Sequence, residues 1–201
     1  MAGLRVARKQ ATRDRVICAA RELFVEVGYE AATIRMIAQR AGVATGSVFT
    51  TFPSKLEILK LVMEERLDRL YAELDGIMPH LRGSVADRLC SIMAVHYDFE
   101  MKRPRLFTAY LAANFEWNDG PAFLIFGSNP RLRGMLHKVL ARGVETGEVR
   151  PDGDFDVFID VIVSAYGMNY RCAVQRGYDT AGLIAMMDRQ IAVAFRGVAA
   201  G

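Results

Sequence analysis

Four short side chains stand close together in one part of this 201-residue chain: Thr45, Gly46, Ser47 and Thr50. They occupy the predicted exposed positions of a short helical segment, where an ordinary solvent-facing helix more often carries Glu and Lys. Short, mostly uncharged side chains allow a helix backbone to approach phosphates and base edges, and hydroxyl groups can form hydrogen bonds there. The chemistry that these residues indicate is therefore recognition of a nucleic acid.

The preceding segment has the residue spacing of a helix–turn–helix. Ala38 is small at the position where a second helix would cross the first. Gly42 follows four residues later and suits a sharp turn with a positive backbone dihedral, and Val48 can then pack the second helix onto the first. Because Ala and Gly are common residues, a helical hairpin that does not touch DNA is the alternative interpretation of this triplet.

The distribution of charge supports the nucleic-acid interpretation. Residues 1–60 hold ten Lys or Arg and five Asp or Glu, a net charge of +5, whereas the remainder holds sixteen and eighteen, a net charge of −2. A basic head on a nearly neutral body can meet a polyanion at one end.

An ordered set of residues extends on both sides of the motif. It comprises Ala19, Ala20, Leu23, Phe24, Gly28, Tyr29, Thr33, Ile37, Ala38, Ala41, Gly42, Val43, Gly46, Ser47, Val48, Phe49, Phe52, Lys55 and Leu56. With these residues, segment 12–59 resembles the DNA-binding domain of the TetR family of bacterial transcriptional regulators.

The resemblance implies a role for each matched polar residue. Thr33 would cap a helix and touch a phosphate, Arg35 would reach a phosphate or a groove edge, and Lys55 would bind a phosphate at the start of the next helix. The residues that would line the major groove are Thr45, Gly46, Ser47 and Thr50. Phe49 stands where the family usually has a tyrosine whose hydroxyl meets a phosphate, so this contact lacks its usual donor.

Basic residues also stand before and at the start of the first expected helix, which we expect to begin after the capping residue Thr12. They are Arg5, Arg8, Lys9 and Arg13. One interpretation is a disordered, solubilising tail. The other is a basic arm that lies along the phosphates or in the minor groove.

Helical periodicity runs through the chain, without strand-like alternation. We therefore expect an all-α fold in which an N-terminal three-helix helix–turn–helix head (residues 1–53) is joined by a long helix to a helical-bundle regulatory body (residues 54–201). The expected helices span residues 13–27, 34–41, 45–51, 54–77, 85–102, 104–117, 122–127, 130–146, 155–176 and 180–198.

The body contains no grouping of residues that is typical of an enzyme. His80, His96 and His137 lack metal-ligand spacing and are interpreted as surface or helix-end residues, and Glu100 and Asp160 are interpreted as isolated charges. We expect no catalytic activity, no cofactor and no metal. A helical enzyme or ligand carrier remains the alternative, but it leaves the basic head unexplained.

The body is rich in aromatic residues and methionine, which line adaptable apolar pockets as well as ordinary cores. The resemblance implies a pocket between the middle helices for a small, largely apolar inducer that releases a repressor from its operator. The candidate lining residues are Tyr110, Trp117, Tyr166, Met168 and Tyr170. A fully packed body without an inducer, and an activator or constitutive regulator, are the alternatives.

The last two expected helices are apolar around much of their circumference, more than burial in one core requires. The resemblance implies that they pair with their copies in a homodimer, which would read a roughly palindromic operator in double-stranded DNA. The candidate interface residues are Ile159, Val163, Ile184, Ile191 and Phe195. Burial within a single chain is the alternative.

The sequence also predicts where the protein works. No apolar run approaches the roughly 20 residues of a membrane span, and the basic N-terminus is not followed by the apolar core of a signal peptide. We therefore expect a cytoplasmic protein without a membrane partner.

Overall fold

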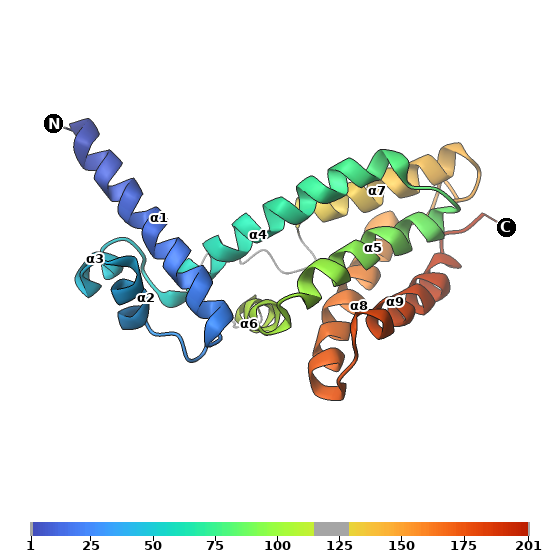
Figure 1. Cartoon of the computed structure of the whole chain (residues 1–201). Helices are drawn as coiled ribbons and strands as arrows, with labels where there is room; N and C mark the ends of the chain where they lie inside the picture. Colours follow the sequence, from blue (N-terminus) through green and yellow to red (C-terminus); the bar gives the residue numbers. More distant parts are fainter. Residues whose placement is uncertain (1, 115–128, 201) are drawn as a thin grey trace. The chain divides into compact units, whose positions relative to one another are not determined.

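The computed structural model describes residues 2–114 and 129–200, and their regular structure is helical (Figure 1). The helices are α1 (Ala2–Glu26), α2 (Ile34–Ala41), α3 (Thr45–Phe49), α4 (Lys55–Ile77), the 3-10 helix η1 (Met78–His80), α5 (Val85–Met101), α6 (Pro104–Asn114), α7 (Pro130–Glu145), α8 (Phe155–Arg176) and α9 (Thr180–Phe195). The prediction of an all-α fold is confirmed. The helix expected at 122–127, and the end of the one expected at 104–117, lie outside the described residues.

The chain divides into two compact units. The N-terminal unit comprises Met1–Asp68 and Arg105–Ala113, and the C-terminal unit comprises Arg69–Pro104 and Asn114–Gly201. The boundary between the units falls inside α4, so this helix contributes residues to both. The division into functional domains at residues 53 and 54 stays a prediction.

The first helix begins earlier than the sequence predicts. It starts at Ala2 and passes through Thr12, which therefore does not cap it. The physical reason is that residues 4–11 contain Leu, Arg, Ala, Lys and Gln, which are good helix formers, and no proline. The expectation of a separate arm before the helix is wrong, because the basic residues belong to α1 itself.

The core of the N-terminal unit forms where α2 packs against α1 and α3. The second half of α1 supplies Ala20, Leu23 and Phe24, α2 supplies Ile37, and α3 supplies Val48, all of them buried. Since α1 buries nothing from residues 6–11, only its second half belongs to this core.

The helices of the C-terminal unit pack pairwise around one apolar core. α5 packs on α9, α9 on α8, α8 on α7, and α7 on α5. Each buries an apolar stripe, for example Leu89 of α5, Leu136 of α7, Ile159 of α8 and Leu183 of α9. Among the described residues, no helix is both long and apolar enough to cross a membrane.

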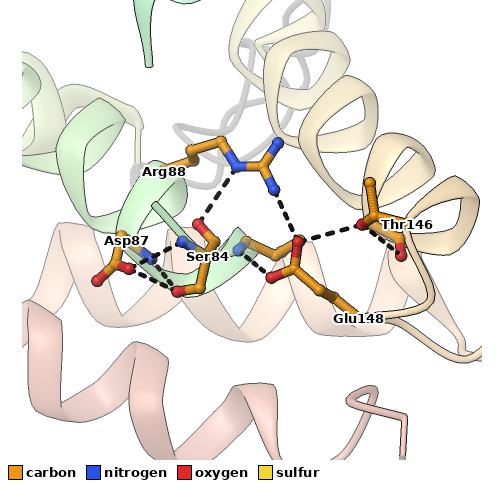
Figure 2. Close-up of polar contacts among 7 residues, drawn as sticks. Ser84, Asp87, Arg88, Thr146 and Glu148 are labelled. Atoms are coloured by element: carbon orange, nitrogen blue, oxygen red, sulfur yellow. Dashed lines mark hydrogen bonds and ion pairs between the residues drawn. The ribbon is translucent and has the colours of Figure 1, made fainter. Parts of the chain in front are cut away.

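A polar junction fixes the start of α5, as Figure 2 shows. Ser84 and Asp87 form a capping box, in which each side chain accepts a hydrogen bond from the backbone N–H of the other residue. Glu148, in the loop after α7, accepts hydrogen bonds from the Val85 N–H at 2.8 Å and from the Arg88 guanidinium at 3.0 Å. The acidic groups satisfy backbone donors that would otherwise be unpaired at a helix start. This junction ties α5 to the end of α7.

Candidate nucleic-acid interface

The turn between α2 and α3 has the geometry that the sequence predicts for a helix–turn–helix. Gly42 adopts the left-handed conformation, with φ of 64°. Its N–H donates to Gln39 at 3.2 Å, and the Val43 N–H donates to the carbonyl of Ala38 at 3.0 Å. Ala38 and Val48 are buried against the neighbouring helices. The three residues therefore hold α3 at a sharp angle to α2, as predicted.

The first helix of the motif begins at Thr33, as predicted. The Thr33 hydroxyl oxygen accepts a hydrogen bond from the Met36 N–H at 3.2 Å, and its backbone is extended. Arg35 lies exposed in the first turn. Both side chains can therefore reach a ligand in solvent, although Thr33 already uses one lone pair of its hydroxyl for the cap.

The recognition candidates lie together on α3 and the residue after it. Thr45, Gly46 and Thr50 are exposed, and Ser47 is half-buried. A Cβ placed on Gly46 would meet no atom within 4 Å, so the backbone is open to approach at this position. The face offers small side chains and an accessible backbone to a partner.

Hydroxyl groups at the end of α3 are already oriented by the backbone. The Thr50 and Thr51 hydroxyls both donate to the carbonyl of Ser47, at 3.0 and 2.8 Å. Each hydroxyl oxygen can still accept a hydrogen bond, for example from an amino group on a base edge.

Phe49 is 59% exposed on the same face. A phenyl ring at this position can make an apolar contact with a thymine methyl group or a sugar, but it cannot donate to a phosphate. The structure thus shows an exposed apolar side chain where the family resemblance implies a tyrosine.

Lys55 has intramolecular partners that the sequence did not predict. Its Nζ donates to the carbonyls of Tyr29 at 2.8 Å, Ala32 at 3.0 Å and Glu30 at 3.3 Å, and it lies 4.3 Å from the centre of the Tyr29 ring. An ammonium group has three hydrogens, so these bonds use its full donor capacity. Lys55 therefore closes the loop between α1 and α2, and its phosphate role stays a prediction.

The basic N-terminal part of α1 begins beside the end of the recognition helix α3. The Arg13 guanidinium carbon lies 5.3 Å from the centre of the Phe52 ring, just after α3. Arg8 and Lys9 are exposed further toward the N-terminus of the same helix. Positive charge therefore continues from the end of α3 along α1.

The C-terminal unit contains two of the predicted ligand-lining residues in one place. Tyr166 and Tyr170 are buried, and their hydroxyl oxygens lie 3.1 Å apart. Met168 is exposed and points away from this core, Tyr110 belongs to α6 in the other unit, and Trp117 lies outside the described residues. Within the described part of the C-terminal unit, the structure brings the two tyrosines together.

Sequence reasoning missed the polar groups beside these tyrosines. His96 and Glu100 of α5, interpreted as a surface or helix-end residue and an isolated charge, are 2% and 0% exposed. Burial lowers the pKa of His96 to about 3, so the ring is neutral at physiological pH. Burial, followed by the neighbouring Tyr170 and Glu100, raises the pKa of Tyr166 well above its ordinary value. The sequence contained one signal of this burial. His96 and Glu100 are four residues apart, so they lie on the same side of α5, among its apolar positions.

The predicted dimer residues lie mostly inside the chain's own core. Ile159, Val163 and Ile191 are buried, and Ile184 and Phe195 are half-buried. Among the side chains of these two helices that the structure describes, the large exposed apolar ones are instead Val157, Val161, Met168 and Val193. A helix that is apolar on all sides does not reveal in its sequence which stripe its own chain covers.

Comparison with known proteins gives consistent matches. Residues 16–62 match the model of bacterial regulatory proteins of the tetR family. The transcriptional repressor KstR2 of Mycolicibacterium smegmatis is 28% identical over 146 residues, which cover 72% of this chain and 71% of that protein. The transcriptional regulator SrpR of Pseudomonas putida is 29% identical over 164 residues, which cover 80% and 74%. These relatives are transcriptional regulators and not enzymes.

Solved structures share the fold. The TetR-family repressor FadR of Thermus thermophilus, in complex with lauroyl-CoA, aligns with a TM-score of 0.75 and 21% identity over 92% of this chain and 94% of that one. KstR2 of Mycobacterium tuberculosis aligns with a TM-score of 0.59 and 24% identity over 94% and 95%.

The contacts of Lys55 predict that Lys55→Ala lowers the free energy of unfolding by about 1–3 kcal/mol, because three loop carbonyls lose a charged donor. Urea denaturation followed by circular dichroism measures the effect. Arg35→Ala, which removes an exposed cation of the same unit, is the control and is expected to change stability by less than about 0.5 kcal/mol. Equal stabilities of the two variants would contradict the structural role of Lys55.

Proposed function

The chain belongs to the TetR family of bacterial regulatory proteins, which are DNA-binding transcriptional regulators, and on this premise we propose that it is a cytoplasmic, homodimeric repressor. We propose further that a small, largely apolar ligand releases it from a roughly palindromic operator. The observation that carries DNA recognition is the exposed face of α3, held by the turn at Gly42 and open at Gly46.

In this proposal α3 enters the major groove, which is about 12 Å wide and admits one helix. Thr45, Ser47 and Thr50 then contact base edges, while Gly46 permits close approach of the backbone. Phe49 supplies an apolar contact from the same face. Thr33 and Arg35, at the start of α2, contact phosphates and position the motif without specifying a sequence.

The basic start of α1 adds contacts of a different kind. An α-helix with its side chains is about 10–12 Å wide, whereas the minor groove is about 6 Å wide. Because these residues are helical, the basic start of α1 lies along the phosphates rather than inside the minor groove. Lys9 stands one turn before Arg13 and on the same side of α1, the side that faces Phe52. Arg15 stands on the other side.

The proposed dimer forms through the exposed stripe of α8. Val157, Val161 and Met168 follow one another at intervals of four and seven residues and are all exposed, so they share one side of the helix. Val193 adds an exposed apolar group on α9, which packs on α8. A two-fold axis through this surface would join two pairs of helices into a four-helix bundle.

Dimerisation also follows from the demands of specificity. One recognition helix reads only a few base pairs, and a genome offers about 10⁶–10⁹ competing sites. Two heads related by a two-fold axis read two half-sites, which makes the operator roughly palindromic.

Repression and release by a ligand are supported by the relatives. KstR2 and KstR are named as repressors, whereas FasR of Mycolicibacterium smegmatis, 35% identical over 89 residues, is named as an activator. Among the similar structures, RolR was solved with resorcinol and FadR of Bacillus subtilis with stearoyl-CoA. In this chain α4 contributes residues to both units, so its tilt can couple ligand binding to the recognition helix.

DNA recognition is tested by selecting bound sequences from random double-stranded DNA and measuring the affinity of the best sequence. We expect Gly46→Glu to weaken this binding by about 30-fold or more, because bulk and negative charge displace at least two base contacts worth about 1–3 kcal/mol each. Gly76→Glu is the matched control, since Gly76 is an exposed helical glycine of α4 whose Cβ would also meet nothing. Operator affinity retained by Gly46→Glu would refute recognition through α3.

The salt dependence of DNA binding tests whether the basic start of α1 contacts phosphates. We expect Lys9→Ala to reduce the slope of log affinity against log salt concentration by about two, for the loss of one phosphate contact in each subunit of the dimer. Arg15→Ala removes the same charge from the opposite side of α1 and should leave the slope close to that of the unmodified protein. Equal slopes for the two variants would show that α1 contributes to DNA binding through long-range charge and not through a phosphate contact of Lys9.

The proposed dimer surface predicts that Val161→Asp gives a monomer with unchanged helix content, because a carboxylate would be buried at the two-fold seam. Analytical ultracentrifugation and circular dichroism provide the two measurements. Val25→Asp, at an exposed apolar position of α1, is the control and should remain dimeric. A wild-type monomer at micromolar concentration, or a dimer of Val161→Asp, would contradict the proposed surface.

A further inference from the structure

The core of the C-terminal unit contains a polar cluster that the proposed DNA binding and dimerisation do not use. His96 and Glu100 lie one turn apart on α5. The rings of Tyr97, Tyr166 and Tyr170 lie 4.8–5.1 Å from one another, and the Tyr166 ring lies 5.5 Å from that of His96. All five residues are buried. A core of this kind is normally apolar, and burial of polar groups costs free energy unless hydrogen bonds compensate it.

One half of the cluster has an evident structural role. Asn169 donates to the Tyr97 hydroxyl at 2.9 Å and to the Gln190 carbonyl oxygen at 2.7 Å, and Gln190 donates back to Asn169 at 3.1 Å. These bonds connect α5, α8 and α9. Because donors and acceptors are matched, this half serves as a clamp between the three helices.

The other half contains a buried polar atom without a partner. Nε2 of His96 has no hydrogen-bond partner among the described residues, although the ring contacts Tyr71 and Tyr166 at centre distances of 5.7 and 5.5 Å. Leaving such an atom unsatisfied costs about 1–3 kcal/mol. Close by, the Tyr166 and Tyr170 hydroxyls lie 3.1 Å apart, and Tyr170 also donates to the His96 carbonyl at 3.3 Å.

We propose that His96, Glu100 and the hydroxyl pair of Tyr166 and Tyr170 bind a hydroxyl group of an otherwise apolar effector. This inference rests on the proposed ligand-controlled function and specifies the chemistry of the ligand. The rings of Tyr166 and Tyr170 contact the apolar body of the ligand, and the polar groups of His96 and Glu100 contact its hydroxyl.

The hydroxyl is selected by the chemistry of the cluster. A neutral imidazole carries one donor and one acceptor nitrogen, and a hydroxyl can serve either, because it both donates and accepts. The same hydroxyl can donate to the Glu100 carboxyl group. A hydrocarbon would leave Nε2 unsatisfied.

The buried polar side chains around this position disfavour an anionic group. The buried polar side chains of the described residues are His96, Glu100 and Asn169, with no Lys or Arg among them, and the sequence of 115–128 contains no Lys or Arg. A carboxylate placed beside Glu100 would bring a further acidic group into an interior whose buried polar side chains, among the described residues, include no Lys or Arg, and burial of an unpaired anion is costly. The cluster therefore selects an alcohol or phenol over the matching carboxylate.

The proposal is tested with two sets of probes: decanol, decanoate and decane, and naphthol, naphthoate and naphthalene. Tryptophan fluorescence and thermal stability of the full chain report binding, and release of the selected DNA is measured in parallel. We expect at least one hydroxyl compound to bind about tenfold or more tightly than both of its partners, the effect of about 1.4 kcal/mol of selective hydrogen bonding.

Three variants connect the preference to the cluster. His96→Phe keeps a ring but removes the unsatisfied nitrogen, so it should melt at a higher temperature than the wild type and lose the tenfold preference over the hydrocarbon. Glu100→Gln keeps the shape but removes the acidic group, so it should reduce the discrimination against the carboxylate. Tyr97→Phe, which breaks the clamp with Asn169, is the matched control: it should lower the melting temperature and keep the preference.

The outcomes separate this site from the regulatory proposal. In one outcome, a hydroxyl compound binds selectively, its binding depends on His96, and it releases no DNA. This result supports the site and overturns the proposal that a ligand controls DNA binding. Release of DNA by a probe with equal effect in the wild type, His96→Phe and Glu100→Gln overturns the site and leaves the regulatory proposal standing. Absence of binding by both hydroxyl compounds, or binding of a carboxylate as tight as that of its hydroxyl partner, also overturns the site.

Discussion

The placement of α3 depends on one packing constraint, the seating of Val48 behind the turn at Gly42. A helix of five residues is far below the roughly 12–15 residues at which isolated helices become stable in water, and α3 also lacks a side-chain cap at its N-terminus. Its conformation is held by the buried side chains of Val48 and Phe52 and by the left-handed backbone of Gly42. Because these anchors use one side of α3, the other side remains available to a partner.

Two cations of the N-terminal unit, Arg40 and Lys55, have different kinds of partner. Arg40 of α2 is paired with Glu22 and Glu26 of α1, but these pairs are exposed and such pairs contribute little to stability. Lys55 instead donates to three backbone carbonyls of the loop between α1 and α2. Two basic residues that look equivalent in sequence therefore serve different structural purposes, and neither is simply a solvated charge.

The C-terminal unit combines an apolar framework with a polar interior. Its four long helices bury aliphatic stripes in the ordinary way, and the bonds of Asn169 add direction to this packing because amide groups pair only in specific geometries. His96 and Glu100 do not contribute to the packing in the same way. A protein retains a buried, unsatisfied imidazole nitrogen at a cost in stability, and such costs are typical of functional positions.

The sequence by itself determined the all-α class, the helix–turn–helix triplet, the helix start at Thr33 and most of the helix bounds. These features depend on periodicity and on local backbone preferences, both of which act within a few residues. Three other properties were decided only by the tertiary structure: the burial of Ile159 and Val163 with exposure of Val157 and Val161, the burial of His96 and Glu100, and the carbonyl partners of Lys55. The physical reason is that α8 is apolar on several sides and α5 carries polar groups within its apolar stripe, so the sequence does not identify the side that neighbouring helices cover. Backbone carbonyls, moreover, have no residue type by which a sequence could reveal them as partners of a lysine.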